Sequence, residues 1–172
     1  EYGHDTQTRR FRCDSHPAAG WNATWTIEDR YGYLPKGTDV RFRYTDLTSG
    51  AEVGLGEAWV APGGLKNAEE AWIPRLMIRR RSPKGSLEST FVAVMEPFAG
   101  SAAIKAIRRL PLRRADGSDA PDSAVAVEVT HVEGGRDLIV ATDPAAPGPL
   151  VQKEWNVVLE GSLCLVRLGK DG

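Results

Sequence analysis

Short apolar runs, separated by clusters of Gly, Pro and Asp, make up most of this chain. The clearest pattern is residues 21–28 (WNATWTIE), in which every second residue is apolar and those between are polar. Residues 39–44 (DVRFRY) repeat this period of two, and Phe11 and Cys13 alternate with arginines up to His16-Pro17. Successive side chains of a strand point to opposite faces of a sheet, so these stretches predict half-buried strands. The stretch of Phe11 and Cys13 is expected to be a short edge strand that ends at His16-Pro17.

Residues 90–95 (TFVAVM) form a different pattern, with apolar side chains on both alternate sets. This pattern predicts a strand covered on both faces. A helix is the competing interpretation, but the run is short and lies between Pro83-Lys84-Gly85 and Pro97, which leaves too few residues for a stable helix. A second apolar run at residues 102–112 predicts a partner strand, joined through a loop at residues 96–100.

Further strands are expected where other short apolar runs occur. Glycines 54 and 56 lie inside one of them and indicate a bulge or the close approach of another segment. Glu133-Gly134-Gly135 predicts one hairpin loop and Glu160-Gly161 a last one. These additional strands are expected at residues 53–60, 72–80, 124–132, 136–141, 155–159 and 162–168. About ten short strands with little helix predict an all-β antiparallel β-sandwich.

The composition is typical of a globular protein and does not indicate a function. The 172 residues are 41% apolar and 26% charged, which is typical of one globular domain, here expected over residues 1–172. The formal net charge of -1 gives no reason to expect a nucleic-acid partner, and no apolar stretch approaches the roughly 20 residues that span a bilayer. Because the chain begins with Glu1 and not Met, we expect it to be the C-terminal part of a longer one.

Three segments resemble a known family: STFVAVMEPFAG (residues 89–100), IKAIRRLPL (104–112) and VAVEVTHVEGGRDLIVATD (125–143). They are similar to the C-terminal region of heparinase II/III-like polysaccharide lyases, and the resemblance is best over residues 72–143. In that family a helical toroid is followed by antiparallel β-sandwich sheets. The resemblance therefore implies a bacterial, periplasmic or secreted parent whose β-elimination machinery lies mostly on the toroid.

The expected function follows from this resemblance. The chain would be a non-catalytic domain that packs on its own N-terminal catalytic toroid and lines the cleft for an acidic polysaccharide. No GxSxG, HExxH, P-loop or GxGxxG motif occurs, so no catalytic residue, metal or cofactor is predicted. His4 and His16 lie beside aspartates in surface segments and are interpreted as solvated pairs. His131 is expected to be a partly buried sheet residue.

Candidate substrate-binding residues are two exposed aromatics and a basic stretch. Tyr31 and Tyr33 flank Gly32 in a loop, where their rings could contact a sugar. The stretch Arg79-Arg80-Arg81 with Lys84 could meet an acidic polysaccharide, together with a second basic group if the two adjoin. That second group is Arg108, Arg109, Arg113 and Arg114. The alternative interpretations are a sandwich core for the five tryptophans and solvation for the arginines.

Two other features leave alternatives open. Asp116, Asp119 and Asp122 could supply oxygen ligands to calcium, but the spacing lacks the EF-hand pattern and a polar turn is favoured. Cys13 and Cys164 could form a disulfide if the first and last strands are neighbours, whereas two buried free thiols are the favoured interpretation.

Two rival functions also remain. One is a carbohydrate-binding module that uses Tyr31 and Tyr33 with an outward tryptophan. The other is an interaction domain that docks a partner through an exposed apolar patch.

Overall fold

The computed structural model describes residues 7–29, 31–60, 71–145 and 148–171. All regular structure in these residues is antiparallel β-sheet without any helix, which confirms the predicted all-β class. Accordingly, no described segment is a helix long and apolar enough to cross a membrane. The strands are β1 (Thr8–Asp14), β2 (Asn22–Thr26), β3 (Val40–Asp46), β4 (Glu52–Val60), β5 (Ala71–Arg79), β6 (Ala93–Ala99), β7 (Ile104–Leu110), β8 (Arg113–Arg114), β9 (Val125–His131), β10 (Arg136–Ala141), β11 (Leu150–Gln152), β12 (Val157–Leu159) and β13 (Leu163–Leu168).

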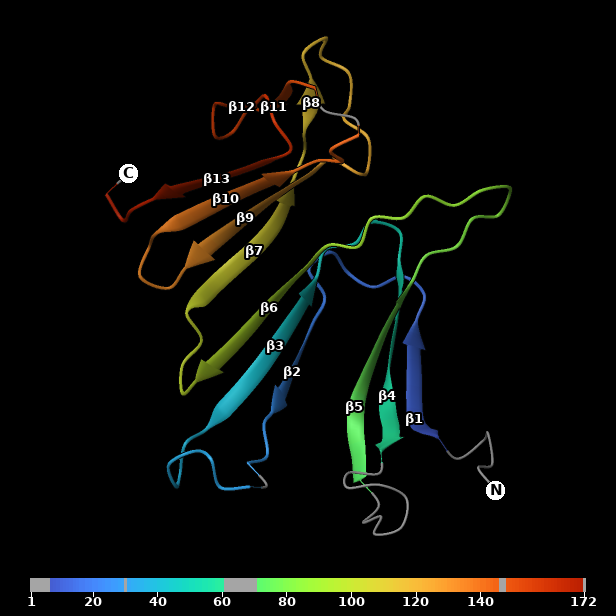
Figure 1. Cartoon of the computed structure of the whole chain (residues 1–172), viewed down its shortest axis with the longest axis vertical. Helices are drawn as coiled ribbons and strands as arrows, with labels where there is room; N and C mark the ends of the chain where they lie inside the picture. The colour runs from blue at the N-terminus through green and yellow to red at the C-terminus, as the bar shows by residue number, and fades with distance from the viewer. Residues whose placement is uncertain (1–6, 30, 61–70, 146–147, 172) are drawn as a thin grey trace. The chain divides into compact units, whose positions relative to one another are not determined.

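The strands fall into two compact units. The first consists of residues 1–18 and 50–88, and the second of residues 19–49 and 89–172. The first contains one sheet of order β1-β4-β5. The second contains three sheets, of orders β13-β10-β9-β7, β12-β11-β8 and β2-β3-β6 (Figure 1).

Two glycines let an aromatic ring pack closely against the backbone of the sheet in the first unit. Phe11 lies over Gly54 and Gly56, where a Cβ on Gly56 would meet the ring at 2.9 Å and the carbonyl oxygen of Arg9 at 3.1 Å. The pairing of β1 with β4 shifts register between Arg9 and Arg12, and Arg10 has a φ of 52° at this bulge. The predicted close approach is therefore confirmed, and the bulge lies on the neighbouring strand β1.

Strand β9 is an inner strand of the four-stranded sheet and is buried on both faces. Ala126 and Glu128 face a cluster that includes Leu138, while Val127 and Val129 face a second cluster with Leu47 and Val92. The first cluster is completed by side chains from the segments around β8, β11 and β12. The near-continuous apolar sequence AVAVEV is thus explained by burial on both sides.

Residues 90–95 do not form the expected doubly covered strand. Strand β6 begins only at Ala93 and continues through Pro97 to Ala99, so the predicted loop at 96–100 is wrong. Its faces alternate, and Phe91 and Met95 are 57% and 63% exposed. Pro97 is tolerated because β6 is an edge strand, where a missing backbone N–H breaks no ladder.

The predicted last hairpin is also wrong. β13 pairs with β10, and β12 pairs with β11, a strand that no sequence pattern indicated. The hairpin of β9 and β10 is confirmed, and Gly134 supplies a φ of 102° in its loop. The β9–β10 hairpin depends on a short local turn. The pairing of β13 depends on a partner that is distant in sequence.

Burial differs from expectation at several polar and apolar positions. Arg43, expected outside, lies partly buried and donates to Glu96 Oε2 from Nε at 3.0 Å. Trp25 is half-buried beside Phe42, with ring centroids 6.2 Å apart. Cys13 and Cys164 are both free thiols, but Cys13 is exposed and not buried as expected.

Candidate functional site

Tyr31 and Tyr33 form an exposed aromatic pair in the loop between β2 and β3. Their side chains are 71% and 84% exposed, and the ring centroids lie 5.9 Å apart with the planes tilted by 44°. Gly32 between them has a φ of 68°, a conformation that favours glycine and places both rings on the outside of a tight turn. The structure therefore brings these two predicted residues together at the surface.

A single carboxylate organises this loop. Asp29 accepts hydrogen bonds from the backbone N–H of Leu34 at 2.6 Å and of Tyr33 at 3.0 Å. Its backbone carbonyl accepts a further bond from Gly32 N–H at 3.4 Å. The hydrogen bond from Leu34 is the main cause that lowers the pKa of Asp29. At neutral pH the ionised carboxylate therefore holds the turn that presents the two rings.

The basic stretch Arg79-Arg80-Arg81 lies in the first unit, and two of its arginines form ion pairs with an acidic side chain. Arg79 donates from Nε to Glu52 Oε2 at 2.9 Å, and Arg81 Nε lies 3.1 Å from the other oxygen of Glu52. The hydrogen bond from Arg79 is the largest cause that lowers the pKa of Glu52. Two predicted ligands for a polyanion thus already share one carboxylate.

Three arginines of the second basic group are paired in the same way. Arg108 Nε donates to Glu128 at 2.7 Å, Arg109 Nη2 donates to Asp122 at 2.9 Å, and Arg113 lies 2.7 Å from Asp119. These pairs connect neighbouring strands and loops of one unit. Arg108 and Arg113 are also about half-exposed, so these ion pairs are compatible with the solvated-arginine interpretation.

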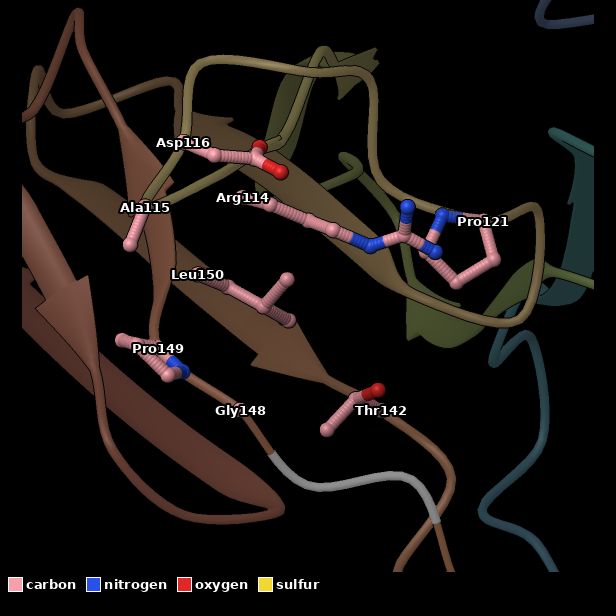
Figure 2. Close-up of a pocket in the computed structure, with 8 residues that line it drawn as sticks. All are labelled: Arg114, Ala115, Asp116, Pro121, Thr142, Gly148, Pro149 and Leu150. Atoms are coloured by element: carbon pink, nitrogen blue, oxygen red, sulfur yellow. The ribbon is translucent and has the colours of Figure 1, made fainter.

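Arg114 lines a pocket of about 420 Å³ in the second unit. Figure 2 shows its side chain extending across the pocket toward Pro121, with Thr142 and Leu150 on the other side. The lining comes from segments far apart in sequence, and this explains why no sequence pattern indicated the pocket. It offers one guanidinium, one carboxylate (Asp116), one hydroxyl and apolar walls.

The three aspartates proposed as calcium ligands face different partners. Asp116 accepts hydrogen bonds from the backbone N–H and hydroxyl of Ser118 at 2.9 and 2.6 Å, while Asp119 and Asp122 face Arg113 and Arg109. Across the described residues, no group of three or more His, Cys, Asp or Glu side chains is arranged to hold a metal. The polar-turn interpretation fits these contacts.

His131 belongs to an ion-pair cluster beside a pocket of about 370 Å³. Its Nε2 lies 3.0 Å from Asp137 Oδ2, and Arg167 donates to both oxygens of Asp137 at 2.7 and 2.8 Å. The hydrogen bond from Arg167 is the main cause that lowers the pKa of Asp137 to about 2. The described lining of this pocket adds the carboxylate of Glu133 and the amine of Lys170 to this cluster, and none of its residues carries a hydroxyl or thiol.

Of the other two histidines, His16 contacts a neighbour in its own segment. His16 Nδ1 lies 2.9 Å from the hydroxyl of its neighbour Ser15 in an exposed segment. His4 lies outside the described residues.

A buried acid, Glu128, lies at the centre of another network. It is 4% exposed and accepts hydrogen bonds from Arg108 and from the indole N–H of Trp155, both at 2.7 Å. Arg136 lies 3.5 Å from the same carboxylate and 4.9 Å from the centroid of the Trp155 ring. The network joins β7, β9 and β10 to the turn before β12 and is structural.

Comparisons with protein-family models, curated proteins and solved structures found no match for this chain.

Proposed function

We propose that this chain is a non-catalytic β domain that contacts a polysaccharide through Tyr31 and Tyr33. The observation that supports the proposal most directly is the exposed, tilted pair of rings on a turn held by Asp29. Sugar rings present apolar C–H faces that stack on aromatic side chains, while their hydroxyl groups need nearby polar partners. Rings that are ordered before binding lose less conformational entropy when a ligand arrives.

The parent protein in this proposal is heparinase II/III-like, and this part rests on the sequence resemblance over residues 72–143 alone. The domain would pack on an N-terminal catalytic toroid and line its cleft. An acidic polysaccharide remains the proposed ligand class, although Arg79 and Arg81 already share Glu52. The implied bacterial, periplasmic or secreted location stays a prediction.

Calorimetry with heparin, alginate and a soluble neutral glucan tests the sugar contact. We expect saturable binding of at least one polymer, and a loss of about tenfold in affinity for Tyr31→Ala or Tyr33→Ala, since one aromatic contact contributes on the order of 1 kcal/mol. Phe91→Ala is the matched control, because Phe91 is an exposed ring of the same unit outside the loop. Binding that is absent, or that survives both tyrosine substitutions, contradicts the proposal.

A direct assay tests the non-catalytic part. Incubating the chain with uronate polymers should produce no absorbance from unsaturated uronate products. Rapid appearance of that absorbance would show that the chain has a proton-transferring set of its own.

A second candidate function, docking of a partner, is favoured by a different observation. Phe91 and Met95 expose apolar surface along β6 and the segment before it. Phe91 also borders a groove of about 420 Å³ whose wall includes Val125, Val127 and Ile139. A domain that packs on a catalytic toroid would cover such surface, and so would an interaction domain with a separate partner.

A further inference from the structure

The long edge strands of the described sheets are protected against pairing with another chain, with one exception. Exposed strand edges present unpaired N–H and C=O groups, and proteins block them with bulges, prolines or charged side chains. β1 has a bulge and three arginines, and β5 and β6 contain Pro74 and Pro97 in mid-strand. β7 has Lys105 at a register shift. Each of these strands has seven or more residues.

β13 is the exception among the described edge strands of six or more residues. It is the outer strand of the order β13-β10-β9-β7, and its pairing with β10 is regular from Leu163 to Leu168. Its sequence LCLVRL contains no Pro, Lys or bulge. Leu163 and Leu165 are 69% and 61% exposed. Its one charged side chain, Arg167, is already paired with Asp137 of the neighbouring strand. A regular and mostly apolar edge of this kind can accept a further strand.

The backbone direction along this edge follows from one hydrogen bond. Thr142 N–H donates to Ser162 C=O at 2.9 Å, so residue 162 faces β10. In an antiparallel ladder, alternate residues direct both backbone groups to the same neighbour. Cys164 and Val166 therefore face β10 as well, whereas Leu163, Leu165 and Arg167 point their N–H and C=O groups to the open edge.

We propose that β13 pairs antiparallel with β13 of a second copy of this chain, so that two four-stranded sheets join into one of eight strands. In this arrangement Leu163 lies opposite Leu165 of the second copy, and Cys164 lies opposite Cys164 on the two-fold axis. Leu163 and Leu165 of both copies then pack against one another on the same face of the joined sheet. Antiparallel pairing of identical strands is self-complementary and gives a closed dimer.

The charge and the backbone geometry of β13 favour a second copy of the chain as its partner. The strand has a single charge, Arg167, which Asp137 of the same copy already neutralises through two hydrogen bonds. No like charges therefore oppose each other across the axis. Residue 164 occupies a non-hydrogen-bonded pair, in which Cα atoms lie about 4.5 Å apart, within the range of a disulfide. Stable interfaces bury roughly 1,200–2,000 Å², and this contact involves a single strand of 6 residues, so the dimer should be weak and dependent on concentration.

Residue-resolved amide exchange at several protein concentrations tests the pairing. In dilute solution the amides of Leu163, Leu165 and Arg167 should exchange rapidly, while those of Cys164 and Val166 are protected by β10. At concentrations where sedimentation detects a dimer, the first set should slow at least tenfold. Fast exchange with a monomer at every concentration overturns the proposal. Protection that is equal at every concentration also overturns it, because another segment would then cover the edge.

Two variants sharpen the result. Leu165→Lys should remove the concentration dependence, and protection of the Cys164 and Val166 amides would show that β13 still pairs with β10. Val132→Lys, in the β9–β10 turn, replaces an equally exposed apolar residue away from the edge and should leave the dimer unchanged. A dimer that persists in Leu165→Lys contradicts the proposal.

Cross-linking tests the register. In a Cys13→Ser background, diamide, which takes up the two thiol hydrogens, should join two copies through Cys164. The absence of this disulfide under conditions in which the dimer forms would overturn the register.

Discussion

Removing the carboxylate of Glu128 should destabilise the second unit by more than the loss of its ion pairs, because a buried hydrogen bond is lost as well. Glu128 is buried on β9 and is the acceptor for the indole N–H of Trp155 and for Arg108. Replacing it with alanine leaves the indole without its acceptor and opens space beside the core. Replacing it with glutamine keeps an oxygen for the indole and removes the charge.

The magnitude follows from the burial of each partner. An indole N–H left unsatisfied in a buried site costs about 1–3 kcal/mol. Arg108 and Arg136 are half-exposed and regain water, so each of these pairs adds about 0–1 kcal/mol. Glu128→Ala should therefore lose about 2–4 kcal/mol of unfolding free energy, and Glu128→Gln about 1–2 kcal/mol.

Urea unfolding, followed by tryptophan fluorescence and by exchange of the β9 amides, measures both losses. Glu154→Ala is the matched control, because Glu154 is an exposed acceptor of the same Arg108 at 2.8 Å and its loss should cost less than about 1 kcal/mol. If Glu128→Ala costs no more than Glu154→Ala, the buried network does not stabilise the sheet and the reasoning is wrong.

The pH dependence of the Glu128 effect has a definite sign. The hydrogen bond from Arg108 is the largest cause that lowers the pKa of Glu128 below its ordinary value of 4.5. A lowered folded pKa contributes stability above the unfolded pKa, and this stability is lost as the pH falls through the folded value. The difference between the wild type and Glu128→Gln should therefore shrink below about pH 4.5.

Two further predictions concern other contacts. The pKa of Asp137 is lowered from 3.8 to about 2, mainly by the hydrogen bond from Arg167. Asp137→Asn should therefore lower the melting temperature at pH 6 and have little effect near pH 2. An equal loss at both pH values would show that the ion pair is not the cause. Gly56→Ala should destabilise the first unit by about 1–3 kcal/mol, because its Cβ would meet Phe11 and the Arg9 carbonyl. Gly161→Ala, which meets no atom within 4 Å, is the control, and equal exchange protection of the β4 amides in Gly56→Ala and the wild type would refute the close approach.

Local pattern was sufficient for the features that depend on neighbours in sequence. The period of two at residues 21–28 and 39–44 predicted β2 and β3, and the loop Glu133-Gly134-Gly135 predicted the β9–β10 hairpin. The exposed position of Tyr31 and Tyr33 also followed from the turn around Gly32. In each case the side-chain period or the backbone freedom of one glycine is a property of a few consecutive residues.

Pairing between distant segments decided the rest. Nothing near residues 96–99 in sequence shows that they pair with β3 as an edge strand, where Pro97 is tolerated. Nor does β13 reveal that it pairs with β10 in place of its neighbour β12. The basic stretch looked available to a polyanion until cross-strand pairing placed Glu52 opposite Arg79.

The sequence by itself therefore determined the class of the fold and the local turns, because the alternation of side chains is set by the backbone of each strand. Only the tertiary structure decided which strands are neighbours, which arginines meet an acid and which apolar faces remain open. These outcomes depend on the free energy of bringing distant segments together, and no local pattern encodes that energy.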